Sequence, residues 1–273
     1  MESTVRRLKR LVDPIHLVAY QADEPTAALM ALGHRNYWDG YFAGRAAPLG
    51  RVSAEVVHAV FYNFADGEVA RHIPRVWDIA SPEAALAARE QGSVAALRRI
   101  LGGLADGPGL VRAADLATKA ATSAPTEGRI LYSGLRTLPV PEEPVARLWH
   151  AATLLRESRG DGHNAALVIA GVGGTESHVL RALSEGIPAA KDGRLQHLPA
   201  AQLAAVMDGM RARGLIDAAS RLTDAGREIR EWIESLTDVA DAPAYDSLEP
   251  CELDQLLADL EPISAALDAA GSR

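Results

Sequence analysis

The fold is decided by residues 199–236, which read PAAQLAAVMDGMRARGLIDAASRLTDAGREIREWIESL. In the first part, apolar side chains recur at helical spacing, at Leu203, Val206, Met207 and Met210. Gly214 ends this helix, and the small residues at 218–220 are typical of a tight turn. Thr223 is then a favourable N-cap for a second, long amphipathic helix. The segment is therefore predicted to fold as a helix, a short β-hairpin and a capped helix.

This order of elements is that of a winged helix. Two strings within it, Arg-Gly-Leu-Ile at 213–216 and Leu-Thr-Asp-Ala-Gly at 222–226, resemble the MarR-type regulators. The rest of the chain has helical rather than alternating periodicity. Residues 24–47 resemble residues 143–166 at a constant offset of 119, which indicates two related halves. We predict a mainly α fold of tandem winged-helix-like halves, with a small β-wing and a C-terminal helix.

Four parts are expected along the chain. A helical, degenerate winged-helix-like domain covers 1–123, and a turn-rich linker covers 124–141. A C-terminal winged-helix-like domain covers 142–245, and a terminal helix covers 246–273. The clearest start signal inside the first part is Ser81-Pro82-Glu83, where a cap, a proline and an acid begin a helix that runs to about Leu101.

The amino-acid composition indicates the compartment in which the protein folds. The 273 residues are 48% hydrophobic, enough for a real core. Cys251 is the one cysteine, so no intramolecular disulfide can form and a reducing compartment fits best. No apolar run reaches the roughly 18 residues that a membrane span needs. We expect a cytoplasmic protein with no membrane partner.

The distribution of charge argues against DNA as a partner. The formal net charge is −8, whereas proteins that neutralise phosphates carry a basic patch. The outward positions of the helix in 199–213 include one acid and no base, at Ala200, Ala201, Gln202, Ala205, Asp208 and Gly209. The hairpin tip offers Arg221 beside Asp217. The segment 186–193, rich in glycine and proline, also leaves little room for a preceding short helix.

The most unusual stretch is 156–163, which reads RESRGDGH. Four ionisable groups alternate with small residues, and the glycines predict a turn between two helices. His163 is the candidate acid–base, and Glu157 or Asp161 would orient it. Arg156 and Arg159 would hold a carboxylate or phosphate, on a turn that ends near a helix N-terminus. The alternative is a purely structural network of ion pairs closing that turn.

Further candidates lie outside this stretch. Arg45, Tyr41 and Trp38 place a guanidinium among aromatic rings, as in a pocket for a planar ligand, although the same rings fit an ordinary core. His150 precedes Glu157 by seven residues, so both share a helix face. Histidines and carboxylates at 150, 157, 163, 176 and 178 match no known metal-ligand spacing, so no metal is predicted.

Several strings together resemble a family of actinobacterial helix-turn-helix proteins of unknown function. They are GRAAPLG at 44–50, IPRVW at 73–77, LWHAATLLRE at 148–157, RGDGH at 159–163 and LTDAG at 222–226. The resemblance covers roughly residues 13–260, and Arg-Gly-Asp-Gly-His is its most specific part. It implies a helical, winged-helix-derived fold and supplies no activity. Family members often have His where Ser158 stands here, which argues against a pair of metal-binding histidines in this segment.

We expect a small-molecule site between the two halves, used for binding or for an acid–base step without a large cofactor. No dinucleotide-binding fingerprint occurs in the required strand–turn–helix context, and the cofactor, if any, stays unknown. The alternative is a ligand-responsive, MarR-like regulator that binds DNA, and a third interpretation is a scaffold that binds partners. A homodimer is expected by analogy, because winged-helix proteins often pair through terminal helices.

Overall fold

The computed structural model describes residues 3–271, and its regular structure is helical. The α-helices are α1 (Thr4–Gln21), α2 (Asp23–Ala31), α3 (Tyr37–Ala46), α4 (Ala54–Phe61), α5 (Val76–Ile79), α6 (Pro82–Leu101), α7 (Pro108–Ser123), α8 (Ile130–Arg136), α9 (Pro144–Ala170), α10 (Gly174–Ser184), α11 (Ala200–Ala212), α12 (Asp224–Asp241) and α13 (Pro250–Gly271). Short 3₁₀ helices are η1 (Ala47–Leu49), η2 (Val69–Arg71), η3 (Gly102–Asp106), η4 (Ala189–Lys191) and η5 (Ala242–Tyr245).

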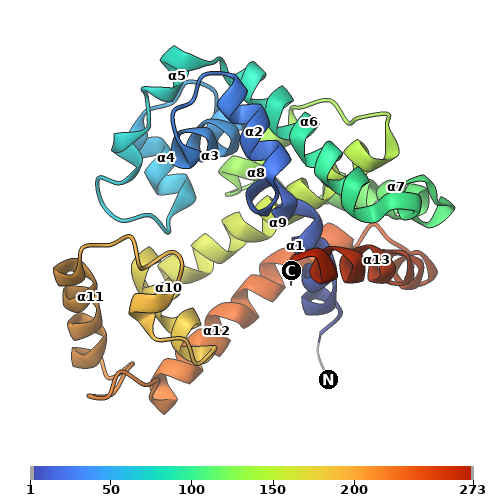
Figure 1. Ribbon diagram of the computed structural model, residues 1–273. Helices are drawn as coiled ribbons and strands as arrows, with labels where there is room; N and C mark the ends of the chain where they lie inside the picture. Colours follow the sequence, from blue (N-terminus) through green and yellow to red (C-terminus); the bar gives the residue numbers. More distant parts are fainter. Residues whose placement is uncertain (1–2, 272–273) are drawn as a thin grey trace.

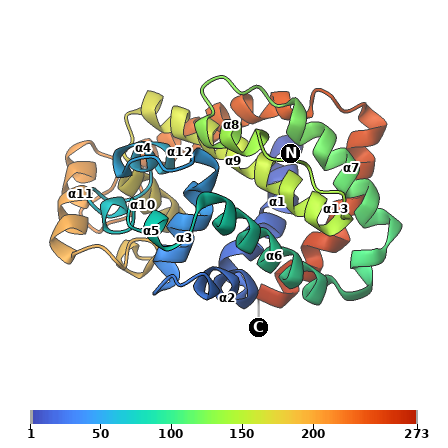
Figure 2. The same cartoon turned by 90° about the horizontal axis from the view of Figure 1, so that it is seen from above.

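Buried apolar side chains form two separate clusters, which we call the large core and the small core. The large core is built by α1 to α8, the first half of α9 and α13. The small core is built by the end of α9 with α10, α11 and α12. In both views α10 and α11 lie at one end of the molecule, and α7 and α13 lie at the other (Figures 1 and 2).

Helix α9 crosses from one core to the other. Its residues between Val145 and Leu155 contribute to the large core, and Ala166 and Leu167 contribute to the small core. Helix α12 makes the same crossing beside it, because Ile233 lies in the small core and Tyr245, just beyond its end, lies in the large core (Figure 1). The polar stretch 156–163 is therefore the part of α9 between the two cores.

The predicted turn at 159–162 is wrong, because α9 continues through it without a break. Glycine is a poor helix former, but here it permits close packing. A Cβ at Gly162 would lie 3.0 Å from the Cβ of Ala240 on α12. The two helices can approach this closely because Gly162 has no side chain. Helix α9 ends at Ala170, where Gly171 is its C-cap in the left-handed conformation, with φ of 61°.

The predicted β-wing is also wrong. Only one isolated bridge, between Ile216 and Leu222, joins the two sides of this turn, and residues 3–271 contain no sheet. The tip is held instead by Asp217, whose carboxylate accepts from the backbone N–H of Arg221 at 2.9 Å. This local hydrogen bond competes with strand pairing. The predicted cap is present, since the Thr223 hydroxyl accepts from the Gly226 N–H at 3.1 Å.

The segment 124–141, predicted as a linker, contains α8. Leu131, Tyr132 and Leu135 of this helix are buried in the large core. The C-terminal helix is present as α13, and positions 272 and 273 lie outside the described residues. The four-part division of the chain and the relation between its halves stay predictions. None of the helices described within 3–271 has both the length and the apolar character needed to cross a membrane.

Candidate functional site

A cavity of about 310 Å³ lies where α9 passes between the two cores. Its walls come mainly from α9, α10 and α12, with Phe61 at the end of α4 and Lys9 of α1. Six of the nine candidate residues line it, and they are His163, Glu157, Asp161, Arg45, Arg156 and Arg159. The structure thus places most of the predicted site around one space, although on a continuous helix rather than on a turn.

Glu157 is held by a buried ion pair. It is 2% exposed, and its two carboxylate oxygens accept from Nε and Nη2 of Arg45 at 3.1 and 3.0 Å. Arg45 also donates to the Tyr41 hydroxyl and stacks on the Phe61 ring, with its Cζ 4.3 Å from the ring centroid. Burial alone would raise the pKa of Glu157, but the charge and hydrogen bonds of Arg45 outweigh it and hold the pKa at about 2. Glu157 is therefore ionised at neutral pH and is poorly suited to proton transfer.

Asp161 behaves differently on the same helix. Burial raises its pKa to about 6, although the backbone N–H of Tyr132 opposes the shift. That N–H lies in the first turn of α8 and donates to Asp161 Oδ2 at 3.0 Å. Asp161 therefore satisfies a free N–H at the start of α8, and its pKa also lies where an acid–base group is useful.

His163 has a defined tautomer. Its Nδ1 lies 3.0 Å from the Thr237 hydroxyl, and that hydroxyl donates its one proton to the Ile233 carbonyl at 2.8 Å. Thr237 must therefore accept from Nδ1–H, which leaves Nε2 of the neutral ring as the basic atom. Burial lowers the pKa of His163, against the opposing charge of Glu234, so the ring is neutral near pH 7.

The two remaining arginines of the stretch join α9 to its neighbours. Arg159 is 6% exposed and reaches three carboxylates of α12, at 3.4, 2.9 and 3.1 Å, from Glu234, Asp238 and Asp241. Arg156 is partly exposed and lies 3.3 Å from Asp13 of α1. The structural alternative, a network of ion pairs, is thus present, and it coexists with a cavity.

Three candidates do not line this cavity. His150 is 4% exposed, and its Nε2 has no hydrogen-bond partner among the described residues. Burial lowers its pKa to about 4. Tyr41 and Trp38 belong to an aromatic cluster with Phe42 and Phe64. Nothing in the geometry brings these three side chains to the space beside His163.

Most of the residues that α10 and α12 contribute to the cavity were not predicted from the sequence. From α10 come Ser177, His178 and Arg181, and from α12 come Arg230, Glu234 and Thr237. Burial lowers the pKa of His178 to about 4, with Arg194 and Arg181 adding to the effect. The sequence of α12 does contain a pattern that could have predicted a polar face, because positions 230, 234, 237 and 241 follow helical spacing and all carry polar side chains.

No group of three histidine, cysteine or acidic side chains within the described residues could hold a metal ion. Glu176, which was considered with His178 as a metal ligand, binds other groups of the protein. It accepts from the backbone N–H of Gly173 at the start of α10 and pairs with Arg213 at 2.9 Å.

The profile of a helix-turn-helix family matches residues 5–272. The chain belongs to this helix-turn-helix family. The match confirms that part of the resemblance, whereas the MarR-like and actinobacterial parts stay predictions. No curated protein and no solved structure matches the chain at a significant level.

In this helix-turn-helix family member, α10 and α11 pack against each other in the small core and are followed by α12. The outward face of α11 is exposed, as predicted from the sequence, over Ala200, Ala201, Gln202, Ala205, Asp208 and Gly209. The nearby arginines each have an acidic partner, in the pairs Arg211–Asp208, Arg213–Glu176 and Arg221–Asp217. This face is therefore neutralised by its own carboxylates.

Proposed function

We propose that the protein binds a small anionic molecule in the cavity between α9, α10 and α12. The observation that supports this most directly is the cavity itself, whose volume of about 310 Å³ lies at the lower end of the range for ligand pockets. It is lined by polar and basic side chains at the meeting point of two cores. Such sites between packed units are common binding positions.

The charges around the cavity favour an anion. Several lining cations are matched by carboxylates: Arg45 by Glu157, and Arg159 by three acids of α12. Lys9 and Arg156, in contrast, share the single carboxylate of Asp13, each at 3.3 Å. Arg230 forms no ion pair with any residue in the described part of the chain. The wall therefore carries more positive than negative charge, which an anionic ligand would balance.

Two neutral imidazoles complete the site. The positive surroundings help to keep the pKa values of His163 and His178 low, so both rings are uncharged at neutral pH. His163 presents Nε2 as a base, so the proposal extends to an acid–base step on the bound molecule, with His163 as the proton acceptor. In that step Glu157 holds the side chain of Arg45 in place. Asp161 also lines the cavity, and its pKa of about 6 lets its carboxyl group exchange a proton near neutral pH.

The experiment is a thermal-shift survey of organic acids and phosphate monoesters with four forms of the full chain. The wild type is compared with Arg230→Gln, His163→Ala and the control Arg227→Gln. Arg230 is the cleaner test, because its removal breaks no ion pair within the described residues. Arg227 lies on the same helix, pairs at the surface with Asp224 and does not line the cavity.

A compound that raises the Tm of the wild type and of Arg227→Gln, but not of Arg230→Gln or His163→Ala, supports the site. Equal responses in all four proteins would place the binding elsewhere. If no compound acts and His163→Ala is merely less stable, the polar stretch of α9 is a structural network.

The second candidate function is a DNA-binding regulator, and the family match favours it. The helices α10, α11 and α12 have the expected order, but contact with phosphates would require the arginines beside α11 to leave their acidic partners. Fluorescence anisotropy with duplex DNA over a range of salt concentrations tests this function. A regulator would bind with a steep salt dependence, as several phosphate contacts require. Binding without that dependence, or none at low salt, would rule against it.

A further inference from the structure

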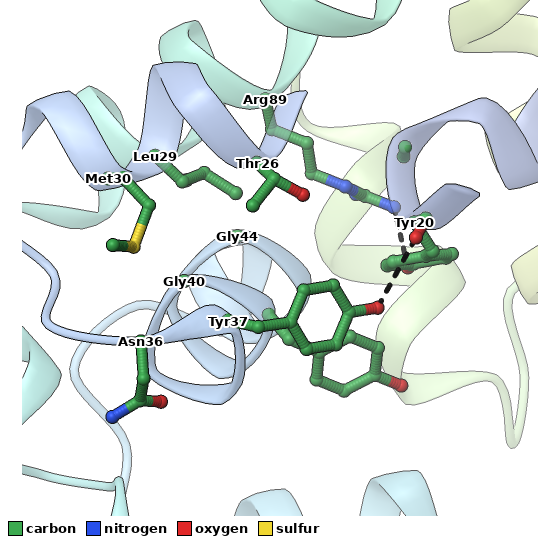
Figure 3. A pocket seen from close by; sticks show the side chains of 11 residues that line it. Tyr20, Thr26, Leu29, Met30, Asn36, Tyr37, Gly40, Gly44 and Arg89 are labelled. Carbon is green, nitrogen blue, oxygen red and sulfur yellow. Dashed lines mark hydrogen bonds between the residues drawn. The ribbon is translucent and has the colours of Figure 1, made fainter. Parts of the chain in front are cut away.

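A second, much smaller pocket lies inside the large-core half of the molecule, between α1, α2, α3 and α6 (Figure 3). It has a volume of about 10 Å³, enough for roughly one water-sized group. Figure 3 shows Arg89 of α6 extending past Thr26 toward Tyr20, with Tyr37 and Gly44 of α3 on the opposite side. None of these residues lines the cavity beside His163.

Arg89 is the unusual member of this pocket. It is 3% exposed, yet it forms no ion pair with any residue in 3–271. One terminal nitrogen donates to the Tyr20 hydroxyl at 2.8 Å, and Nε is buried without an acceptor. The rings of Tyr20 and Trp149 lie 5.3 Å from the guanidinium carbon, measured to each ring centroid. Aromatic faces stabilise a cation, but they neither accept the Nε–H nor balance the charge.

Among residues 3–271, no neighbouring group supplies the missing negative charge. Glu157 is the buried carboxylate of this region, and both its oxygens are engaged by Arg45. Burial raises the pKa of Tyr20, so its hydroxyl stays neutral. An unpaired buried charge is strongly unfavourable unless something compensates it. An anion at this point would satisfy both the charge and the free Nε–H.

We propose that Arg89 binds the carboxylate of a small organic acid, which enters past Met30 and Tyr37. A space for one water-sized group admits one carboxylate oxygen, which can accept from the free Nε–H of Arg89, while the rest of the carboxylate lies toward the mouth. Met30 and Tyr37 line the pocket and are each 39% exposed, so the hydrocarbon part of the acid can lie at the mouth. Gly44 keeps the space beside Arg89 open, because a Cβ there would lie 3.2 Å from the Arg89 Cδ. This site is independent of the cavity beside His163.

The test is a titration of the full chain with sodium acetate and sodium butyrate at constant ionic strength, followed by Tm and by calorimetry. Three variants accompany the wild type. Arg89→Met removes the charge at similar length, and Thr26→Leu fills the adjacent space without touching the charge. Arg230→Gln alters the other cavity and serves as the control.

The expected result is a saturable rise in Tm for the wild type and for Arg230→Gln, lost in Arg89→Met and in Thr26→Leu. If Arg89→Met does not fold, Thr26→Leu decides by the same criterion. The proposal is overturned if the carboxylates stabilise all four proteins equally, or stabilise none. It is also overturned if chloride replaces the carboxylates with equal effect, because the occupant would then be an inorganic ion. Loss in Arg230→Gln alone would assign the binding to the other cavity and reject this site.

Discussion

The substitution Glu157→Gln tests the buried ion pair that joins α3 to α9. Glutamine keeps the size of the side chain and removes its charge, so Arg45 would remain in place without a counter-charge. The Arg45 side chain is 15% exposed and that of Glu157 is 3% exposed, so water can screen little of the lost interaction. The loss should therefore appear as a large decrease in the free energy of unfolding.

The size of the effect follows from the pKa of Glu157. This pKa lies at about 2 rather than at its ordinary 4.5, which corresponds to ~3 kcal/mol of stabilisation of the ionised form. Removing one partner of a buried pair typically costs about 3–5 kcal/mol. We predict a loss of ~3 kcal/mol, and a decrease in Tm of roughly 6–12 °C for a chain of this size.

The assay is urea denaturation followed by circular dichroism, with Glu24→Gln as the matched control. Glu24 also pairs with an arginine, Arg99, but the pair is largely exposed, so its loss should cost under ~1 kcal/mol. The double variant Arg45→Met with Glu157→Gln should be more stable than Glu157→Gln alone, because it leaves no unpaired charge. If Glu157→Gln costs no more than Glu24→Gln, the ion pair does not stabilise the fold as argued.

Three further predictions concern the same region. Gly162→Val should destabilise the fold by about 1–3 kcal/mol, because its side chain would meet Ala240 on α12. Gly160→Ala would place its Cβ 3.2 Å from the flexible end of Arg156 and at an ordinary contact distance of 3.5 Å from Glu157 Oε2, so it should be neutral or slightly stabilising; thermal unfolding of the two variants checks this contrast. Arg159→Met should lower stability at pH 7 by ~3 kcal/mol, since three carboxylates of α12 lose their partner. Burial already raises the pKa of one of them, Asp241, to about 6, so part of that loss should disappear at pH 4, where Asp241 is protonated; urea denaturation at the two pH values decides it. Burial keeps His178 neutral in the fold and lowers its pKa from 6.5 to about 4, so its contribution to the free energy of unfolding is present above pH 6.5 and is lost as pH falls through 4. His178→Gln should therefore flatten the dependence of the free energy of unfolding on pH between these two values. An unchanged pH dependence would contradict the burial argument.

Local signals predicted single elements well. The Ser81-Pro82-Glu83 start is confirmed, with the Ser81 hydroxyl accepting from the Ala84 N–H at 3.2 Å at the beginning of α6. The Thr223 cap is also confirmed. These features depend on a few neighbouring residues, so a single sequence contains the information. The same logic failed at the predicted wing, where a side-chain contact within the turn replaced strand pairing.

The continuity of α9 depends on contacts that the sequence does not show. Gly160 and Gly162 predict a break when read alone, but α12 packs against Gly162 and supports the helix there. Six of the candidate residues line one cavity, so the sequence predicted which of them lie together, while their role in a site stays a prediction. Arg181 and Arg230 were missed, and His178 was considered only as a metal ligand, since their helices lie beside this cavity only in the folded chain. The sequence feature that indicates this cavity is the polar stretch 156–163 of α9, which lies between two apolar stretches of the same helix.

The most direct test of the small-molecule site is a phosphate titration of the full chain followed by the imidazole resonances of His163 and His178 in heteronuclear NMR spectra. An anion bound between α9, α10 and α12 lies beside both rings and should raise both pKa values toward 6.5, and the shifts should be weaker in Arg230→Gln than in Arg227→Gln. The proposed binding site would be contradicted if the resonances of these two histidines did not move, while those of exposed histidines responded only to ionic strength.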